Sequence, residues 1–165
     1  MTRANASPWA VAGLYIFAAM LFSSPLIDLF STAWPPRVGD LAWRYGFMGL
    51  AAGYLQTPML GLVLACAVTY WQGHAGTLRV LGFVSVLAAA VLLPILGLWP
   101  MDVMQMRGLR APEVQSGVAI GGAIQELKYL GGFLVLGILG IGCIRTASEV
   151  RRTSSRQTPG IVSRA

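Results

Sequence analysis

Four long apolar runs, joined by short polar links, make up most of this chain of 165 residues. They cover about residues 9–30, 45–71, 78–99 and 122–144. A membrane-spanning helix needs about 20 consecutive apolar residues, and each run meets this requirement. Only 11% of the residues are charged, whereas a soluble domain carries about 25%. The sequence therefore predicts an all-α integral membrane protein, a bundle of four transmembrane helices.

The longest polar segment, residues 100–121, lies between the third run and the fourth. It mixes charged residues with apolar ones such as Met101, Val103 and Leu109. This mixture is typical of an amphipathic helix that lies on the membrane surface. We therefore predict a short interfacial helix before the last span.

The two ends of the chain invite separate interpretations. Residues 146–165 are rich in Ser, Thr and Arg and lack hydrophobic periodicity, which predicts a disordered basic cytoplasmic tail. Residues 1–145 then form the transmembrane domain. A cleavable signal peptide is the alternative for the first run, because the small residues Ser31-Thr32-Ala33 follow it. Cleavage would leave the other spans in place.

Basic residues are distributed unevenly over the two sides of the predicted bundle. With four spans the termini share a side, which carries seven basic residues and one acid, Glu149. The other side carries five of each sign. Lys and Arg near span ends favour the cytoplasm, so we expect a bacterial inner-membrane protein with both termini cytoplasmic. Topology and attraction to anionic lipid account for the net charge of +6 without a nucleic-acid partner.

The balanced side includes the segment around which the chain is organised, Trp34 to Leu62. Charges at the membrane edge are costly unless they are hydrated or paired. Equal numbers of acids and bases favour ion pairs that cap the bundle or bind a partner, and we expect Asp40 and Arg44 each to pair. Separately hydrated side chains are the alternative. This outer-face charge cluster consists of Arg37, Asp40, Arg44, Asp102, Arg107, Arg110 and Glu113.

Glycines recur at helical spacing in the second run. Gly49 and Gly53 form a GxxxG pair, a pattern that lets another helix approach closely in lipid. We predict that both pack against a helix of this chain or of a partner. The alternative is the ordinary enrichment of glycine in membrane-spanning helices.

A few polar residues fall inside the predicted spans. Gln56 lies in the second run, and Gln125, Glu126 and Lys128 lie early in the fourth. Such groups often mark transport pathways. Glu126 and Lys128 are two residues apart, hence on nearly opposite helix faces, so they do not form one relay. A transporter or channel is favoured if Gln56 and Gln125 face each other across a water-filled cavity.

Signatures of catalysis are missing from the sequence. A single histidine, His74, excludes a bis-histidine haem. Cys66 and Cys143 lie in separate apolar runs, which predicts small core residues and no redox pair. No Gly-rich phosphate loop, HExxH or GxSxG sequence occurs. We therefore predict no enzymatic activity and no metal or cofactor.

One stretch resembles a group of poorly characterised bacterial four-helix membrane proteins, some named for hormogonium polysaccharide biosynthesis. The resemblance rests on Pro35-Pro36-Arg37-x-Gly39-Asp40-x-x-Trp43-Arg44-Tyr45-Gly46, followed by Thr57-Pro58-x-x-Gly61-Leu62. In those proteins a loop with Pro and Trp precedes a second helix that contains a Pro-x-x-Gly-Leu turn. The resemblance implies a four-helix membrane fold and identifies no catalytic residues.

These features together predict a small polytopic membrane protein with a non-catalytic role, an accessory or assembly subunit of a larger membrane complex. A small transporter or channel is the alternative, and a membrane enzyme comes third. The expected partners are membrane lipids and another membrane protein or a second copy of the chain.

Overall fold

The computed structural model describes residues 7–156, with side chains as far as Glu149, and this part of the chain forms five helices without a strand. The helices are α1 (Pro8–Ala33), α2 (Leu41–Tyr54), α3 (Gln56–Gln72), α4 (Ala75–Gly108) and α5 (Pro112–Arg156). Only Leu55 separates α2 from α3, so the two form one span. The all-α bundle of four spans that the sequence predicts is confirmed.

The break between α2 and α3 has a covalent cause. Pro58 has no N–H to donate to the carbonyl of Tyr54, so the regular hydrogen-bond ladder is interrupted there. Leu55 nevertheless keeps helical backbone angles, with φ −57° and ψ −36°. The direction of the span therefore continues through the break.

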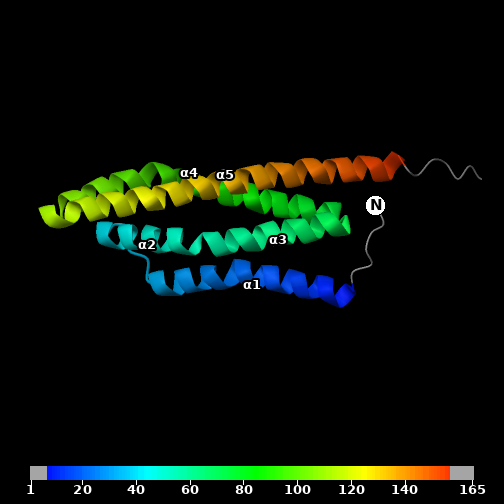
Figure 1. Cartoon of the computed structure of the whole chain (residues 1–165), viewed down its shortest axis with the longest axis horizontal. Helices are drawn as coiled ribbons and strands as arrows, with labels where there is room; N and C mark the ends of the chain where they lie inside the picture. The colour runs from blue at the N-terminus through cyan, green and yellow to red at the C-terminus, as the bar shows by residue number, and fades with distance from the viewer. Residues whose placement is uncertain (1–6, 157–165) are drawn as a thin grey trace, which may run out of the picture.

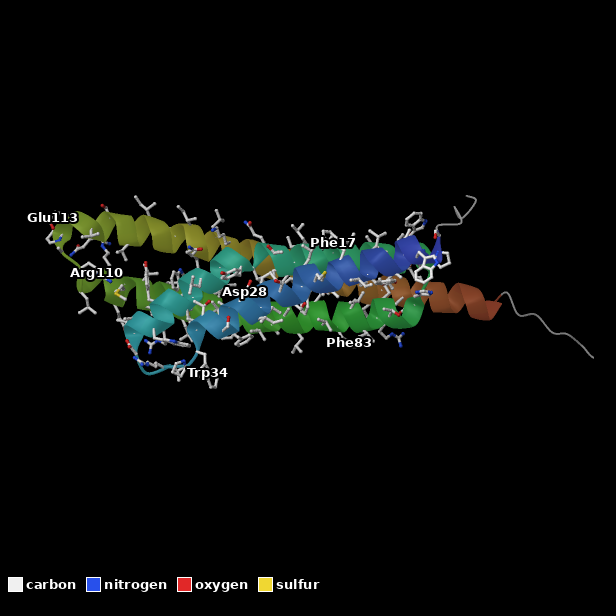
Figure 2. All side chains as sticks on the ribbon, turned by 90° about the horizontal axis from the view of Figure 1, so that it is seen from below. Phe17, Asp28, Trp34, Phe83, Arg110 and Glu113 are labelled. Atoms are coloured by element: carbon white, nitrogen blue, oxygen red, sulfur yellow. The ribbon has the colours of Figure 1, made fainter. Side chains whose placement is uncertain are left out.

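Four segments are long and apolar enough to cross a membrane: Pro8–Ala33, Leu41–Gln72, Ala75–Gly108 and Pro112–Glu149. Their outward surfaces carry large apolar side chains, and Figure 2 shows Phe17 and Phe83 on opposite edges of the molecule. Soluble proteins rarely expose apolar surface on this scale. The arrangement is that of a multi-pass membrane protein.

Successive spans run antiparallel (Figure 1). Helices α4 and α5 pair along their length, α2 and α3 pack beside them, and α1 contacts α2 and α3 but not α4 or α5. The start of α1 and the end of α5 lie at the same end of the bundle. The opposite end, called the charged end below, carries the α1–α2 loop (residues 34–40) and the α4–α5 turn (residues 109–111).

The link between α3 and α4 is a tight turn at Gly73. Its φ of 72° lies in the left-handed region, where a side chain would be strained. The Gly73 N–H donates to the Tyr70 carbonyl at 3.1 Å, and the His74 N–H donates to the Thr69 carbonyl at 3.2 Å. These bonds close the end of α3 and reverse the chain within two residues.

The structure corrects one sequence-based prediction and part of another. No separate interfacial helix precedes the last span, because α4 continues through Pro100 to Gly108 and α5 begins at Pro112. The mixed apolar and charged segment instead forms a helical hairpin that extends beyond the ends of α1 and α2 (Figure 1). The predicted tail is helical as far as Arg156, and its remainder lies outside the described residues.

Helices approach most closely at glycines. A Cβ on Gly61 of α3 would lie 2.7 Å from the Ala18 carbonyl oxygen of α1. A Cβ on Gly140 of α5 would lie 2.8 Å from the Gly82 carbonyl oxygen of α4. Small residues at these positions allow backbones to touch, which drives helix packing in lipid.

The core consists of two clusters of buried apolar residues. The larger cluster contains residues of α2, α3, α4 and α5, namely Ala52, Leu62, Ala89, Leu92, Tyr129 and Leu136. The smaller contains Cys66, Leu78, Cys143 and Ala147. The prediction that the two cysteines are core residues is confirmed, and the structure brings them into one cluster from α3 and α5.

Candidate functional site

An ion pair between α2 and α4 lies at the charged end. Arg44 Nη2 donates to Asp102 Oδ1 at 2.8 Å and Arg44 Nε donates to Asp102 Oδ2 at 3.1 Å. A third bond runs from Arg44 Nη1 to the Val38 carbonyl at 3.1 Å. Asp102 is only 5% exposed, while 31% of the Arg44 side chain is accessible. This two-pronged geometry suits the planar guanidinium and fixes the α1–α2 loop to α4.

Asp40 has a different role from the expected ion pair. Its Oδ1 accepts hydrogen bonds from the backbone N–H groups of Ala42 at 2.8 Å and Trp43 at 3.5 Å. These are otherwise unpaired donors at the start of α2, so Asp40 is the N-cap of that helix. Within residues 7–156 it makes no ion pair.

The remaining members of the outer-face charge cluster stay apart. Arg37, Arg107, Arg110 and Glu113 are exposed and form no ion pair in the described part of the chain. Figure 2 shows Arg110 and Glu113 at the tip of the α4–α5 hairpin. The structure thus brings together Arg44 and Asp102 and leaves these four side chains accessible to solvent or a partner.

Aromatic side chains join α2, α4 and α5 below this ion pair. Trp99 is 1% exposed and donates from Nε1 to the Gly122 carbonyl at 2.9 Å. Its ring stacks on Tyr45, with centroids 5.1 Å apart, and meets the edge of Tyr129 at 6.4 Å. The Tyr129 hydroxyl donates to the Met48 carbonyl. Each buried polar atom of these rings has a partner, as stable burial requires.

A second aromatic contact holds the end of α1. Trp43 donates from Nε1 to the Ala33 carbonyl at 3.1 Å, which joins the start of α2 to the end of α1. The Trp43 ring also stacks on Phe47, with centroids 5.1 Å apart and planes 4° from parallel. Interfacial tryptophans commonly occupy such positions at the membrane edge.

Gly49 and Gly53 have no neighbour within the described chain. A Cβ built on either would meet no heavy atom within 4 Å. The helix contact predicted for this pair is therefore not made inside residues 7–156, where Gly61, Gly82, Gly122, Gly132 and Gly140 provide the close approaches. Packing against a helix of a partner stays a prediction.

The predicted intramembrane polar residues do not gather at one place. Gln56 is exposed and makes no side-chain hydrogen bond in the described chain, and Lys128 is half-buried. Gln125 Oε1 and Glu126 Oε2 are buried without a hydrogen-bond partner. Glu126 lines a cavity of about 240 Å³ between α4 and α5, together with Trp99, Arg107 and neighbouring residues but neither glutamine.

In the described ranges, no group of three or more His, Cys, Asp or Glu residues is placed to hold a metal ion. Comparisons with protein-family models, curated proteins and solved structures find no match. The resemblance to bacterial four-helix membrane proteins stays a prediction.

Sequence analysis missed the aromatic contacts and the cap. Asp40 directly precedes the apolar residues of α2, which is an N-cap signature. Trp99 and Tyr129 carry no comparable signal, because their partners come from helices distant in the sequence.

Proposed function

We propose that this chain is a non-catalytic accessory or assembly subunit of a larger membrane complex. One observation supports this role above the others. The α2 face around Gly49 and Gly53 has the close-packing spacing but no neighbour within 4 Å, whereas Gly61, Gly82 and Gly140 lie against the backbone of another helix. A helix from outside this chain would fill that face.

Gln56 adds a polar contact point to the same face. It follows Gly49 and Gly53 at helical spacing, and helical backbone angles persist through Leu55. An exposed amide in the hydrocarbon is costly, and across helices it can form hydrogen bonds. The partner is therefore another membrane protein that offers a small-residue helix face with a hydrogen-bonding group, or a second copy of this chain.

Leucine substitutions test the role directly. A Cβ added at Gly49 or Gly53 would meet no atom of another helix within 4 Å, so we expect Gly49→Leu and Gly53→Leu to leave the thermal stability of the isolated protein in mild detergent unchanged. The same variants should lose the proteins that co-purify with the wild type, as measured by mass spectrometry. Gly97→Leu is the matched control, because that glycine of α4 also has no neighbour within 4 Å. Unchanged co-purification in both α2 variants would contradict the proposal.

We place the protein in a bacterial inner membrane with both termini in the cytoplasm. The excess of basic residues on the side of the termini supports this orientation. The described ends of α1 and α5 also lie at one end of the bundle (Figure 1). A C-terminal reporter that works only in the periplasm should be inactive, and an active fusion would reverse the assignment.

A small transporter or channel is the second candidate, favoured by one observation. Gln125 Oε1 and Glu126 Oε2 are buried without partners, and buried polar atoms normally have one. Water or a transported ion would supply it. If the wild type conducts ions into proteoliposomes and Glu126→Gln abolishes this flux, the protein is a transporter or channel and not an accessory subunit. Absence of flux in the wild type argues against this candidate.

A further inference from the structure

A groove runs between α1 and α4, whose Cα atoms do not come within 8 Å of each other. Its volume is about 430 Å³. Side chains of α2 and α3, with Tyr129 and Leu136 of α5, form its floor. The lining is almost wholly apolar, with Phe22 and Phe30 on one wall and Val84 to Ile95 on the other. In a membrane, such a groove is open to lipid and not to water.

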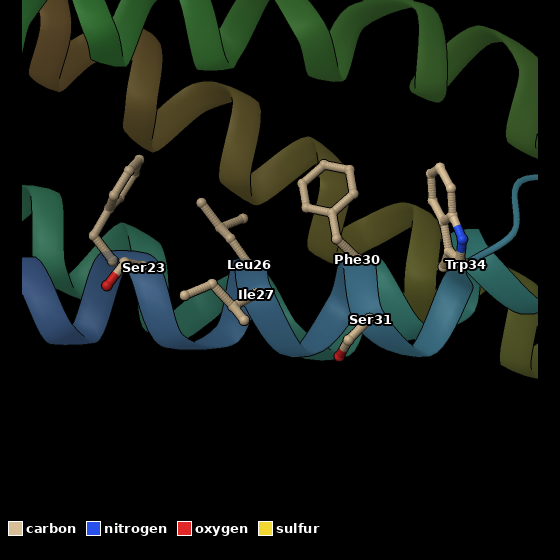
Figure 3. A pocket seen from close by; sticks show the side chains of 7 residues that line it. Ser23, Leu26, Ile27, Phe30, Ser31 and Trp34 are labelled. Atoms are coloured by element: carbon tan, nitrogen blue, oxygen red, sulfur yellow. The ribbon is translucent and has the colours of Figure 1, made fainter.

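The α1 wall is a single row of apolar side chains. Phe22, Leu26, Phe30 and Trp34 are spaced four residues apart, which places them on one helix face. A second hollow shares the first three and continues the row to Trp34. Figure 3 shows Leu26, Phe30 and Trp34 pointing from α1 toward the side of α4, while Ser31 points away. The groove is therefore continuous with the charged end.

The length and the apolar lining of the groove suit a hydrocarbon chain. From Val84 to Ile95 the α4 wall is about 16 Å long, at 1.5 Å per residue. An extended acyl chain can lie along a wall of this length, and the almost wholly apolar lining suits its methylene groups.

The depth of the groove matches one leaflet. Half of a hydrocarbon core of about 30 Å is about 15 Å, close to the length of the α4 wall. Trp34 ends the apolar row at the charged end, where an interfacial aromatic ring is expected. The lining residues thus extend from the level of the headgroups toward the middle of the bilayer.

A cation for a lipid phosphate lies in the adjoining loop. The α1–α2 loop carries Arg37, which is exposed and without an ion pair in the described residues. The nearby charges are already engaged, since Asp40 caps α2 and Arg44 pairs with Asp102. A guanidinium with free donors complements a phosphate.

We propose that the groove between α1 and α4 binds one acyl chain of a phospholipid from the leaflet at the charged end, with the lipid phosphate beside Arg37. This site lies on the opposite face of α2 from Gly49 and Gly53, because Phe47 and Ala51 line the groove. Lipid binding here is therefore independent of the proposed partner contact.

Native mass spectrometry of the delipidated full chain in mild detergent tests the site. Palmitoyl-oleoyl phosphatidylglycerol should bind saturably, one molecule per chain. Ala88→Phe places a ring in the groove and should lower the affinity about tenfold or more. Ala90→Phe is the matched control, because Ala90 is exposed on α4 and does not line the groove. Equal binding by the two variants would overturn the proposal.

A second experiment tests the contact between Arg37 and the lipid phosphate, and it needs no substitution inside the bundle. Arg37→Gln should weaken binding of phosphatidylglycerol and leave binding of a diacylglycerol with the same chains unchanged. Equal phosphatidylglycerol affinities of this variant and the wild type would overturn the headgroup assignment. Non-saturable binding by the wild type, or a dimer that Ala88→Phe dissociates, would overturn lipid as the occupant.

Discussion

Helices α4 and α5 are packed together along their length, whereas α1 is attached along one side only. Between α4 and α5, Gly82 and Gly140 bring the backbones into contact, and Trp99 forms a hydrogen bond across the pair. Helix α1 reaches α3 at Gly61 and α2 through the Trp43 hydrogen bond, but it does not meet α4.

The difference lies in which neighbours each helix has, because α4 and α5 face each other along their length while α1 meets only α2 and α3. Without a hydrophobic driving force between helices in lipid, stability comes from close packing and from hydrogen bonds. The α4–α5 pair has both, with backbone contact at Gly82 and Gly140 and the hydrogen bond from Trp99. Helix α1 has a close approach at Gly61 and two hydrogen bonds, one from Trp43 and one between Tyr15 and Thr69 at 3.0 Å, but all of them join it to α2 and α3. A groove remains on its α4 side.

Gly140→Leu should have the largest effect. Its side chain would meet the Gly82 carbonyl oxygen and the Val86 N–H of α4, which are backbone atoms with little room to move. We expect the free energy of unfolding in detergent to fall by about 3 kcal/mol. Gly137→Leu is the control, because that position has no neighbour within 4 Å. Equal stability of the two variants would mean that α4 and α5 are not held together at this point.

Gly61→Leu should weaken the attachment of α1 to α3. A Cβ at Gly61 already lies 2.9 Å from the Phe22 backbone nitrogen, so α1 has to move away. We expect the free energy that holds α1 against α3 to fall by about 2 kcal/mol, without an effect on the other helices. Limited proteolysis should cut the α1–α2 loop faster, while hydrogen exchange in α4 and α5 stays unchanged. Cooperative unfolding of the whole bundle would show that α1 is not peripheral.

Removal of the Arg44–Asp102 ion pair should lower the stability less than these glycine substitutions do. The loss caused by changing one partner should depend on whether the other is present. Arg44→Ala leaves the nearly buried Asp102 carboxylate without its partner, so the unfolding midpoint should fall by a few degrees. The double variant with Asp102→Ala should be less harmful than the sum of the single changes. Strictly additive losses would indicate that the two side chains act independently.

Trp43→Phe should produce the smallest change. Phenylalanine keeps a ring to stack on Phe47 and removes only the N–H that donates to the Ala33 carbonyl. We expect the local stability at the end of α1 to fall by less than about 1 kcal/mol, which faster hydrogen exchange there would detect. If exchange in α4 and α5 accelerates equally, α1 is coupled to the rest of the bundle more tightly than its contacts indicate.

Much of the architecture could be predicted from the sequence because it depends on local properties. The four apolar runs are long enough to span a bilayer, and length and hydropathy require no knowledge of neighbours. The N-cap at Asp40 was also readable, since a cap bonds to residues two and three positions ahead. Expecting an ion pair for Asp40 overlooked this local use of a carboxylate.

Which distant residues meet was decided by the tertiary structure. Arg44 could have paired with several acids, and only the packing of α2 on α4 selects Asp102. The GxxxG spacing of Gly49 and Gly53 identifies a face but not a neighbour, and the close contacts in this chain occur at Gly61, Gly82 and Gly140. Hydrophobic length is a property of each segment by itself, whereas a contact requires two surfaces, and the second surface lies elsewhere in the chain.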